Sequence, residues 1–134
     1  MTAGKTDRPA AGHILRYVYL FEEEQRRGRD EGVKERFVVV VGVEGSRYLV
    51  AAITTKGEGR KNAVAIPDEI ARAAGLAPGS AIVVSEFNRF TWPGFDIRPL
   101  MKQPGYIAGR LPPRFTAKTI DAIAAWGAAA VDRD

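Results

Sequence analysis

The sequence predicts a mainly β domain with short helices, folded as a small, strongly bent sheet or barrel. Six or seven short segments rich in aromatic and β-branched residues alternate with Pro/Gly punctuation, which is the pattern of short strands. Helical character is confined to one short internal segment and one longer segment near the end of the chain. A length of 134 residues fits one domain with its own core.

The first part of the chain contains a lead-in, a strand and a charged connection. Residues 1–11 are small and polar, and we expect a disordered lead-in to a single domain spanning 12–130. Residues 13–21 (HILRYVYLF) have the composition of a strand. Residues 22–36 mix both charges in a long connection, which predicts either a functional loop or a solvated arm with no task.

The remaining strands follow in quick succession. Residues 37–43 (FVVVVGV) are apolar throughout, so we expect this strand to be covered on both faces. A Gly-rich basic loop is expected at 56–62. The other predicted strands are 47–55, 63–66, 80–92, 95–100 and 105–111.

Two helices complete the expected fold. Pro67 precedes a short helix over 68–74, whose first turn carries carboxylates that suit the helix dipole. Thr116 is a candidate N-cap for a helix over 117–130. Apolar or small residues recur there at helical spacing, which predicts one amphipathic face made of Ile120, Ile123, Ala124 and Gly127.

Composition excludes several classes of chemistry. The chain has no Cys, so disulfides, thiolate metal sites and thiol nucleophiles are absent, and its one His (His13) excludes a paired-imidazole site. No carboxylate cluster has metal-site spacing, so we expect neither metal nor cofactor. Residues 1–11 lack a signal-peptide apolar stretch and no run is long enough to span a membrane, which favours the cytoplasm. Twenty Lys and Arg against sixteen Asp and Glu give a net charge of +4, which permits a polyanionic partner.

Arginine, hydroxyl and amide groups are the chemistry that remains. They gather at strand ends in four stretches, 34–36, 53–56, 59–61 and 86–92. Arginine presents a planar fork of donors that suits a phosphate, and aromatic rings interleaved with Asn and Arg can stack bases and contact their edges. Each stretch also has a plain structural interpretation, as a core aromatic or a surface charge.

The order of motifs along the chain resembles the MazF/PemK family of toxins. The similarity spans about residues 12–128 and rests on GHILRYV, then DEGVKER ahead of FVVVV, then AAITTK, then SAIVVSEFNRFTW. The resemblance implies an SH3-like small β-barrel with a C-terminal helix, usually a homodimer. It also implies the toxin of a toxin–antitoxin pair, a metal-independent endoribonuclease that cuts single-stranded RNA through the ribose 2′-hydroxyl. The expected partners are therefore single-stranded RNA and an acidic antitoxin.

The resemblance also implies roles for particular residues. Arg36 takes the position of the catalytic Arg, Thr54 that of the Thr ending the second core strand, and Glu31 that of the loop Glu. Arg89 matches the basic residue of a later turn. Together with the stretches above, the expected RNA-binding residues are Lys34, Thr55, Lys56, Arg60, Lys61, Asn88, Arg89 and Trp92.

Two alternatives stay open at this point. Phe37 stands where the family has Pro and Phe87 where it has Gln, which leaves open a degenerate barrel that binds RNA or protein without cutting. The gyrase-binding CcdB proteins share the fold and act through a Trp-Gly pair at the very C-terminus; here Trp126-Gly127 is followed by further residues. A core or dimer-interface position is the other interpretation of Trp126.

Overall fold

The computed structural model describes residues 8–21, 34–55, 59–94, 96–100 and 105–133. That part of the chain forms nine strands and two helices. The strands are β1 (His13–Tyr19), β2 (Lys34–Glu44), β3 (Arg47–Thr54), β4 (Ala63–Ala65), β5 (Ala81–Val83), β6 (Glu86–Thr91), β7 (Ile97–Arg98), β8 (Ile107–Arg110) and β9 (Ala129–Asp132). The helices are α3 (Asp68–Ala73) and α4 (Pro113–Trp126).

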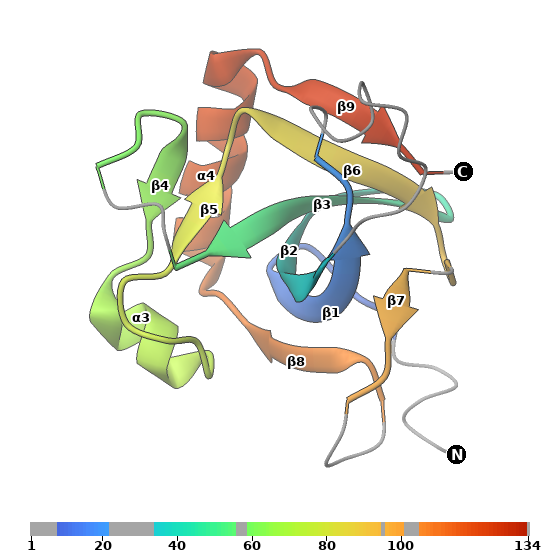
Figure 1. Cartoon of the computed structure of the whole chain (residues 1–134), viewed down its shortest axis with the longest axis horizontal. Coiled ribbons are helices and arrows are strands. Elements are labelled where there is room, and N and C mark those ends of the chain that lie inside the picture. Colours follow the sequence, from blue (N-terminus) through green and yellow to red (C-terminus); the bar gives the residue numbers. More distant parts are fainter. Residues whose placement is uncertain (1–7, 22–33, 56–58, 95, 101–104, 134) are drawn as a thin grey trace.

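All nine strands belong to one sheet. Its main order is β4-β5-β3-β2-β1-β7; β6 also pairs with β3, β8 also pairs with β1, and β9 runs parallel to β6 while the other pairs are antiparallel. The sheet curls between β4 at one side of Figure 1 and β7 at the other, with α3 beside β4 and β5. Among the described residues no ladder joins β4 to β7, so the sheet is open rather than closed into a barrel. The mainly β fold class is confirmed.

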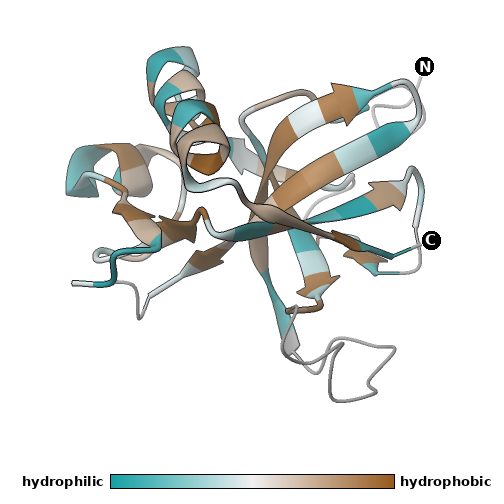
Figure 2. Ribbon diagram, turned by 90° about the horizontal axis from the view of Figure 1, so that it is seen from above, coloured by the Kyte–Doolittle hydropathy of each residue, from teal (hydrophilic) through white to brown (hydrophobic). Residues whose placement is uncertain are grey.

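The valine run of β2 is covered on both faces, as the sequence predicts. Val38 and Val40 lie in a cluster rich in aromatic rings, and Val39 and Val41 lie in a second cluster that includes Phe115 of α4. All four valines are buried, and full burial of a valine stabilises the fold by about 1.5–3 kcal/mol relative to exposure. Figure 2 shows the hydrophobic residues concentrated in the middle of the molecule, and hydrophilic residues toward the ends of several strands.

The start of β2 differs from the sequence-based expectation. The strand begins at Lys34, within the predicted charged connection, because the backbone of 34–39 pairs with β1 from Tyr19 back to Ile14. Backbone pairing therefore extends three residues past the apolar run. Residues 22–33 of that connection lie outside the described residues.

The single strand predicted over 80–92 is wrong, because two strands occupy it. β5 pairs with the last residues of β3 and with β4, whereas β6 pairs with the first four residues of β3. The chain changes ladders between them, and the N–H of Val84 donates to the carbonyl of Asn62 at 2.8 Å. The stretch 80–92 therefore forms two strands that pair with opposite ends of β3.

The last helix begins earlier and ends earlier than expected. It starts at Pro113, and Thr116 is not its N-cap but a buried residue of its first turn, whose hydroxyl donates to the carbonyl of Pro112 at 3.0 Å. It ends at Trp126, where Gly127 adopts φ 73°, a left-handed conformation that favours glycine. Phe115, Thr116 and Thr119 are the buried residues of the helix. Of the expected face, Ile123 packs against the core, whereas Ile120 and Ala124 are exposed, so the expected face is wrong in part.

Residues near both ends of the described chain also pack against the rest of the fold. Residues 129–132 form β9, which the sequence pattern did not predict. Of the expected lead-in, residues 1–7 lie outside the described residues, whereas Pro9 is buried and the guanidinium of Arg8 lies 5.9 Å from the centre of the Tyr48 ring. Within the described chain neither helix has the length and apolar character needed to cross a membrane.

Candidate functional site

A cleft opens where β2 and β3 separate. The two strands pair from Glu44 and Arg47 at their hairpin as far as Val38 and Ala52. Beyond that point Ile53 and Thr54 pair with β5, while the first residues of β2 pair with β1. The two walls of the cleft are therefore the start of β2 and the end of β3.

The cleft has a volume of about 680 Å³, within the range of about 300–1,000 Å³ usual for ligand sites. It combines three guanidinium groups and one carboxylate with hydroxyl, amide and apolar groups. Its lining residues are Arg16, Phe21, Glu35, Arg36, Phe37, Ile53, Thr54, Thr55, Arg60, Asn62 and Val83. Such a lining favours an anionic ligand that also carries an apolar or aromatic part.

Arg36 brings a cation to the β2 wall. Its guanidinium carbon lies 4.8 Å from the centre of the Phe21 ring, a cation–π contact that holds the side chain in place. Its Nε is buried and has no hydrogen-bond partner within the described part of the chain. A buried donor without an acceptor is costly, and the fixed positive charge of this guanidinium suits an anion that enters the cleft.

Arg16 and Glu35 were not among the residues expected at the site. The Arg16 Nε donates to Glu35 Oε2 at 2.8 Å, its Nη2 forms an ion pair with the same oxygen, and its Nη1 donates to the carbonyl of Pro99 at 2.6 Å. These contacts hold the guanidinium in one orientation. A lone charge within the apolar strand HILRYVYLF was the sequence signal that could have identified Arg16.

The β3 wall carries the expected hydroxyl groups. Thr54 ends β3 and is half-buried, and Thr55 and Arg60 are exposed residues beyond it. Asn62, which also lines the cleft, donates to the hydroxyl of Ser85 at 3.1 Å, and this bond fixes the orientation of its amide. Arg36, Thr54, Thr55 and Arg60, all expected from the sequence, thus line one cleft.

Asn88, an expected RNA contact, has a structural position instead. Its side chain is completely buried in β6. The amide accepts the N–H of Leu20 at 2.9 Å and donates to the carbonyl of Leu20 at 2.7 Å. It completes the hydrogen bonding of the chain just after β1, so it cannot present its amide to a base edge.

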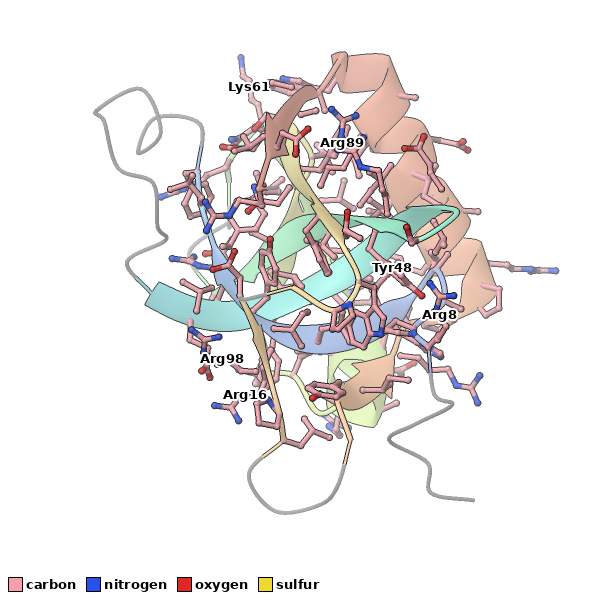
Figure 3. The ribbon with its side chains drawn as sticks, turned by 90° about the vertical axis from the view of Figure 1, so that its right-hand side faces the viewer. Arg8, Arg16, Tyr48, Lys61, Arg89 and Arg98 are labelled. Carbon is pink, nitrogen blue, oxygen red and sulfur yellow. The ribbon has the colours of Figure 1, made fainter. Side chains whose placement is uncertain are left out.

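Three further expected RNA contacts lie away from the cleft lining. Arg89 faces Asp132 of β9 at 3.6 Å, and Trp92 packs against Tyr48 and Tyr106 with ring centres 5.5 Å apart in each case. Lys61 is exposed but does not line the cleft. In Figure 3, Lys61 and Arg89 lie at the opposite end of the view from Arg16 and Arg98.

Some expected site residues fall outside what the structure describes. Glu31 and Lys56 lie outside the described residues, and Lys34 is described only as the first backbone position of β2. Among the described residues, no three His, Asp or Glu side chains are grouped as metal ligands would be.

Tyr19 lies at the end of β1 in the aromatic cluster. Burial raises the pKa of its hydroxyl well above the ordinary value, and the nearby Glu86 carboxylate raises the pKa further. The side chain therefore stays a neutral phenol at physiological pH.

Trp126 is not a core residue of the folded chain. It is 49% exposed at the last position of α4, and Gly127 ends the helix. The core interpretation is therefore wrong, and the interface interpretation stays a prediction.

No protein-family model matches this chain, and no curated protein matches it significantly. The function must therefore be argued from the cleft and from the order of motifs.

Proposed function

We propose that this protein is an endoribonuclease that cuts single-stranded RNA in the cleft between β2 and β3. The observation that carries the proposal is that Arg36 and Thr54, from different strands, line the same cleft. The resemblance to the MazF/PemK toxins had matched these two residues to the family's catalytic Arg and Thr.

The chemistry of the step explains the residue types. The ribose 2′-oxygen bonds to the adjacent phosphorus while the bond from phosphorus to the 5′-oxygen breaks; a base takes the 2′-hydroxyl proton, and the leaving 5′-oxygen gains one. Negative charge accumulates on the non-bridging oxygens in the transition state. Arg36 would neutralise that charge, and Thr54 would donate to the same oxygens.

A carboxylate is the natural base for this step. The resemblance matches Glu31 to the family's loop Glu, which makes it one candidate, and Glu31 lies outside the described residues. Within the described cleft Glu35 is the carboxylate present, and its Oε1 is not used by Arg16, whose contacts are to Oε2. Replacing each carboxylate by its amide separates the two assignments.

The wider proposal follows the resemblance. The bent sheet would be an open version of an SH3-like barrel, two copies would form a cytoplasmic homodimer, and an acidic antitoxin segment would occupy the cleft. The cationic lining of Arg16, Arg36 and Arg60 supports such a partner, because an acidic peptide would compete with RNA for the same guanidinium groups.

The direct test is incubation of the purified protein with a mixed-sequence single-stranded RNA in excess EDTA. We expect fragments that end in a 2′,3′-cyclic phosphate, and no cut at a site whose 2′-hydroxyl is replaced by hydrogen. Cleavage that requires Mg²⁺, or that proceeds at a 2′-deoxy site, would contradict this mechanism.

The exposed Trp126 favours one second candidate, a toxin that binds gyrase through the end of α4. Under that alternative, gyrase supercoiling would be inhibited by the wild type and not by Trp126→Ala. If wild type and Trp126→Ala both cut RNA and neither inhibits gyrase, the gyrase alternative is contradicted, and an interface between copies of the chain becomes the interpretation of Trp126 to test.

A further inference from the structure

Phe37 is an aromatic side chain exposed in the cleft. The large hydrophobic side chains exposed among the described residues are Phe37, Val43, Ile120 and Trp126. Of these, only Phe37 lines the cleft, where 37% of it is exposed. A single exposed hydrophobic residue on a protein surface is common and needs no explanation. An exposed aromatic residue inside a cleft of ligand size is a candidate ligand contact.

The surroundings of Phe37 differ from those of the other aromatic residues. Tyr17, Tyr48 and Phe90 are buried and contact one another or neighbouring rings. The ring of Phe37 contacts no other ring within the described part of the chain. With 37% of the residue exposed, part of the ring is available to a planar group of a ligand.

Arg16 lies beside this ring. It pairs directly with Phe37 across the β1–β2 ladder, and directly paired residues project from the same face of a sheet. A guanidinium carries five N–H donors, of which the bonds to Glu35 and Pro99 use three. Two donors remain for a ligand, on a side chain that is already held in place.

We propose that Phe37 and Arg16 form a nucleotide subsite: one base stacks on the Phe37 ring, and the adjoining phosphate binds the free donors of Arg16. This inference rests on the proposed function, because it names how the same cleft holds single-stranded RNA. Ile53 and Val83 supply apolar surface to the same cleft, and Arg36 and Arg60 supply further phosphate contacts.

The first experiment measures binding without cleavage. The probe is a fluorescent ten-nucleotide RNA with every 2′-hydroxyl methylated, in EDTA, and the readout is anisotropy. We expect Phe37→Ala and Phe37→Leu to weaken binding by about 5- to 100-fold, because stacking is lost, while Phe37→Tyr stays within about twofold. Val43→Ala is the matched control, since Val43 is 44% exposed near the other end of β2.

A second probe separates stacking from charge. An abasic strand of the same length keeps the phosphates and removes the bases, so wild type should bind it more weakly, and Phe37→Ala should bind it as wild type does. Arg16→Gln should reduce the slope of log affinity against log salt by about 0.7, the value for one phosphate contact on a single strand. Phe37→Ala should leave that slope unchanged.

Each outcome decides the matter. Binding by Phe37→Ala and Phe37→Leu equal to wild type would overturn the subsite, as would a wild type that does not prefer the strand with bases or does not bind it at all. Should Phe37→Ala fail to fold, the contrast between Phe37→Leu and Phe37→Tyr supplies the same comparison. Phe37-dependent binding by a protein that cuts no RNA would uphold the subsite and contradict only the proposed catalysis.

Discussion

The two halves of β2 differ in what holds them and in what they can do. Val38 and Val39 pair with both β1 and β3, and Val40 pairs with β3. The side chains of these residues and of the bulged Val41 are buried on both faces of the sheet. Residues 34–37 pair with β1 alone. Arg36 and Phe37 both line the open cleft, although successive residues of a strand project from opposite faces of the sheet. A strand paired on both sides builds the core, and a strand that loses one neighbour leaves polar and aromatic groups available to a ligand.

Replacing Phe90 in the core and Phe37 in the cleft wall by alanine tests this contrast between the two halves of β2 and their surroundings. Phe90 is 2% exposed and packs against three other rings, so Phe90→Ala should lower the free energy of unfolding by about 3–5 kcal/mol. Phe37→Ala should lower it by less than about 1 kcal/mol, because the ring is already partly in water. Urea denaturation of both variants is the measurement. Equal losses would mean that the cleft wall carries as much stability as the core.

Asn88 sharpens the distinction between structural and RNA-contacting residues. Asn88→Ala should lower the free energy of unfolding by about 2–4 kcal/mol, since it leaves the buried N–H and carbonyl of Leu20 without partners. RNA affinity of the folded variant should equal that of wild type. A stable variant with weakened RNA binding would restore Asn88 to the binding surface.

Arg60 and Lys61 are neighbours in the chain with different positions. Arg60 lines the cleft and Lys61 does not, so Arg60→Ala should reduce the salt slope of RNA binding by about 0.7 while Lys61→Ala retains the wild-type slope. Titration of RNA binding between 50 and 200 mM salt measures both. A reduced slope for Lys61→Ala would show that the RNA path runs outside the cleft.

The smallest expected effect concerns Tyr19. Because the pKa of its hydroxyl is raised in the folded state, the folded protein holds this proton more tightly than the unfolded chain does. The stabilisation is complete below the unfolded pKa of about 10 and is lost as the pH rises toward the folded pKa. The stability of Tyr19→Phe should therefore fall less than that of wild type above pH 10. If the free energy of unfolding of both proteins falls equally above pH 10, groups other than Tyr19 cause the loss of stability at alkaline pH.

The sequence predicted the elements that depend on local pattern. The valine run required a strand covered on both faces, and Pro67 with the following carboxylates marked the start of α3. The break at Val84 and Ser85 carries no such local signal, because it comes from β5 and β6 pairing with different parts of β3. β9 was missed for the same reason: its four residues become a strand only beside β6.

Some residues of the candidate site could likewise be predicted from local sequence, whereas others depend on contacts between distant parts of the chain. The positions of Arg36 and Thr54 could be named because each stands at the end of an apolar run, where a side chain becomes accessible. Arg16 could not, since its place in the cleft depends on Glu35 across the ladder and on the Pro99 carbonyl, 83 positions away. The burial of Asn88 was equally invisible, because its partner Leu20 is 68 positions away.

The central claim is that the opening between β2 and β3 is where RNA is cut, and Arg36 tests it most directly. The measurement is single-turnover cleavage of single-stranded RNA in EDTA by wild type, Arg36→Ala and the control Arg72→Ala, an exposed position on α3. We predict that Arg36→Ala slows cleavage by about 10²–10³-fold with unchanged thermal unfolding, while Arg72→Ala cuts at the wild-type rate. Cleavage by folded Arg36→Ala at the wild-type rate would contradict the claim and place the reaction elsewhere on the molecule.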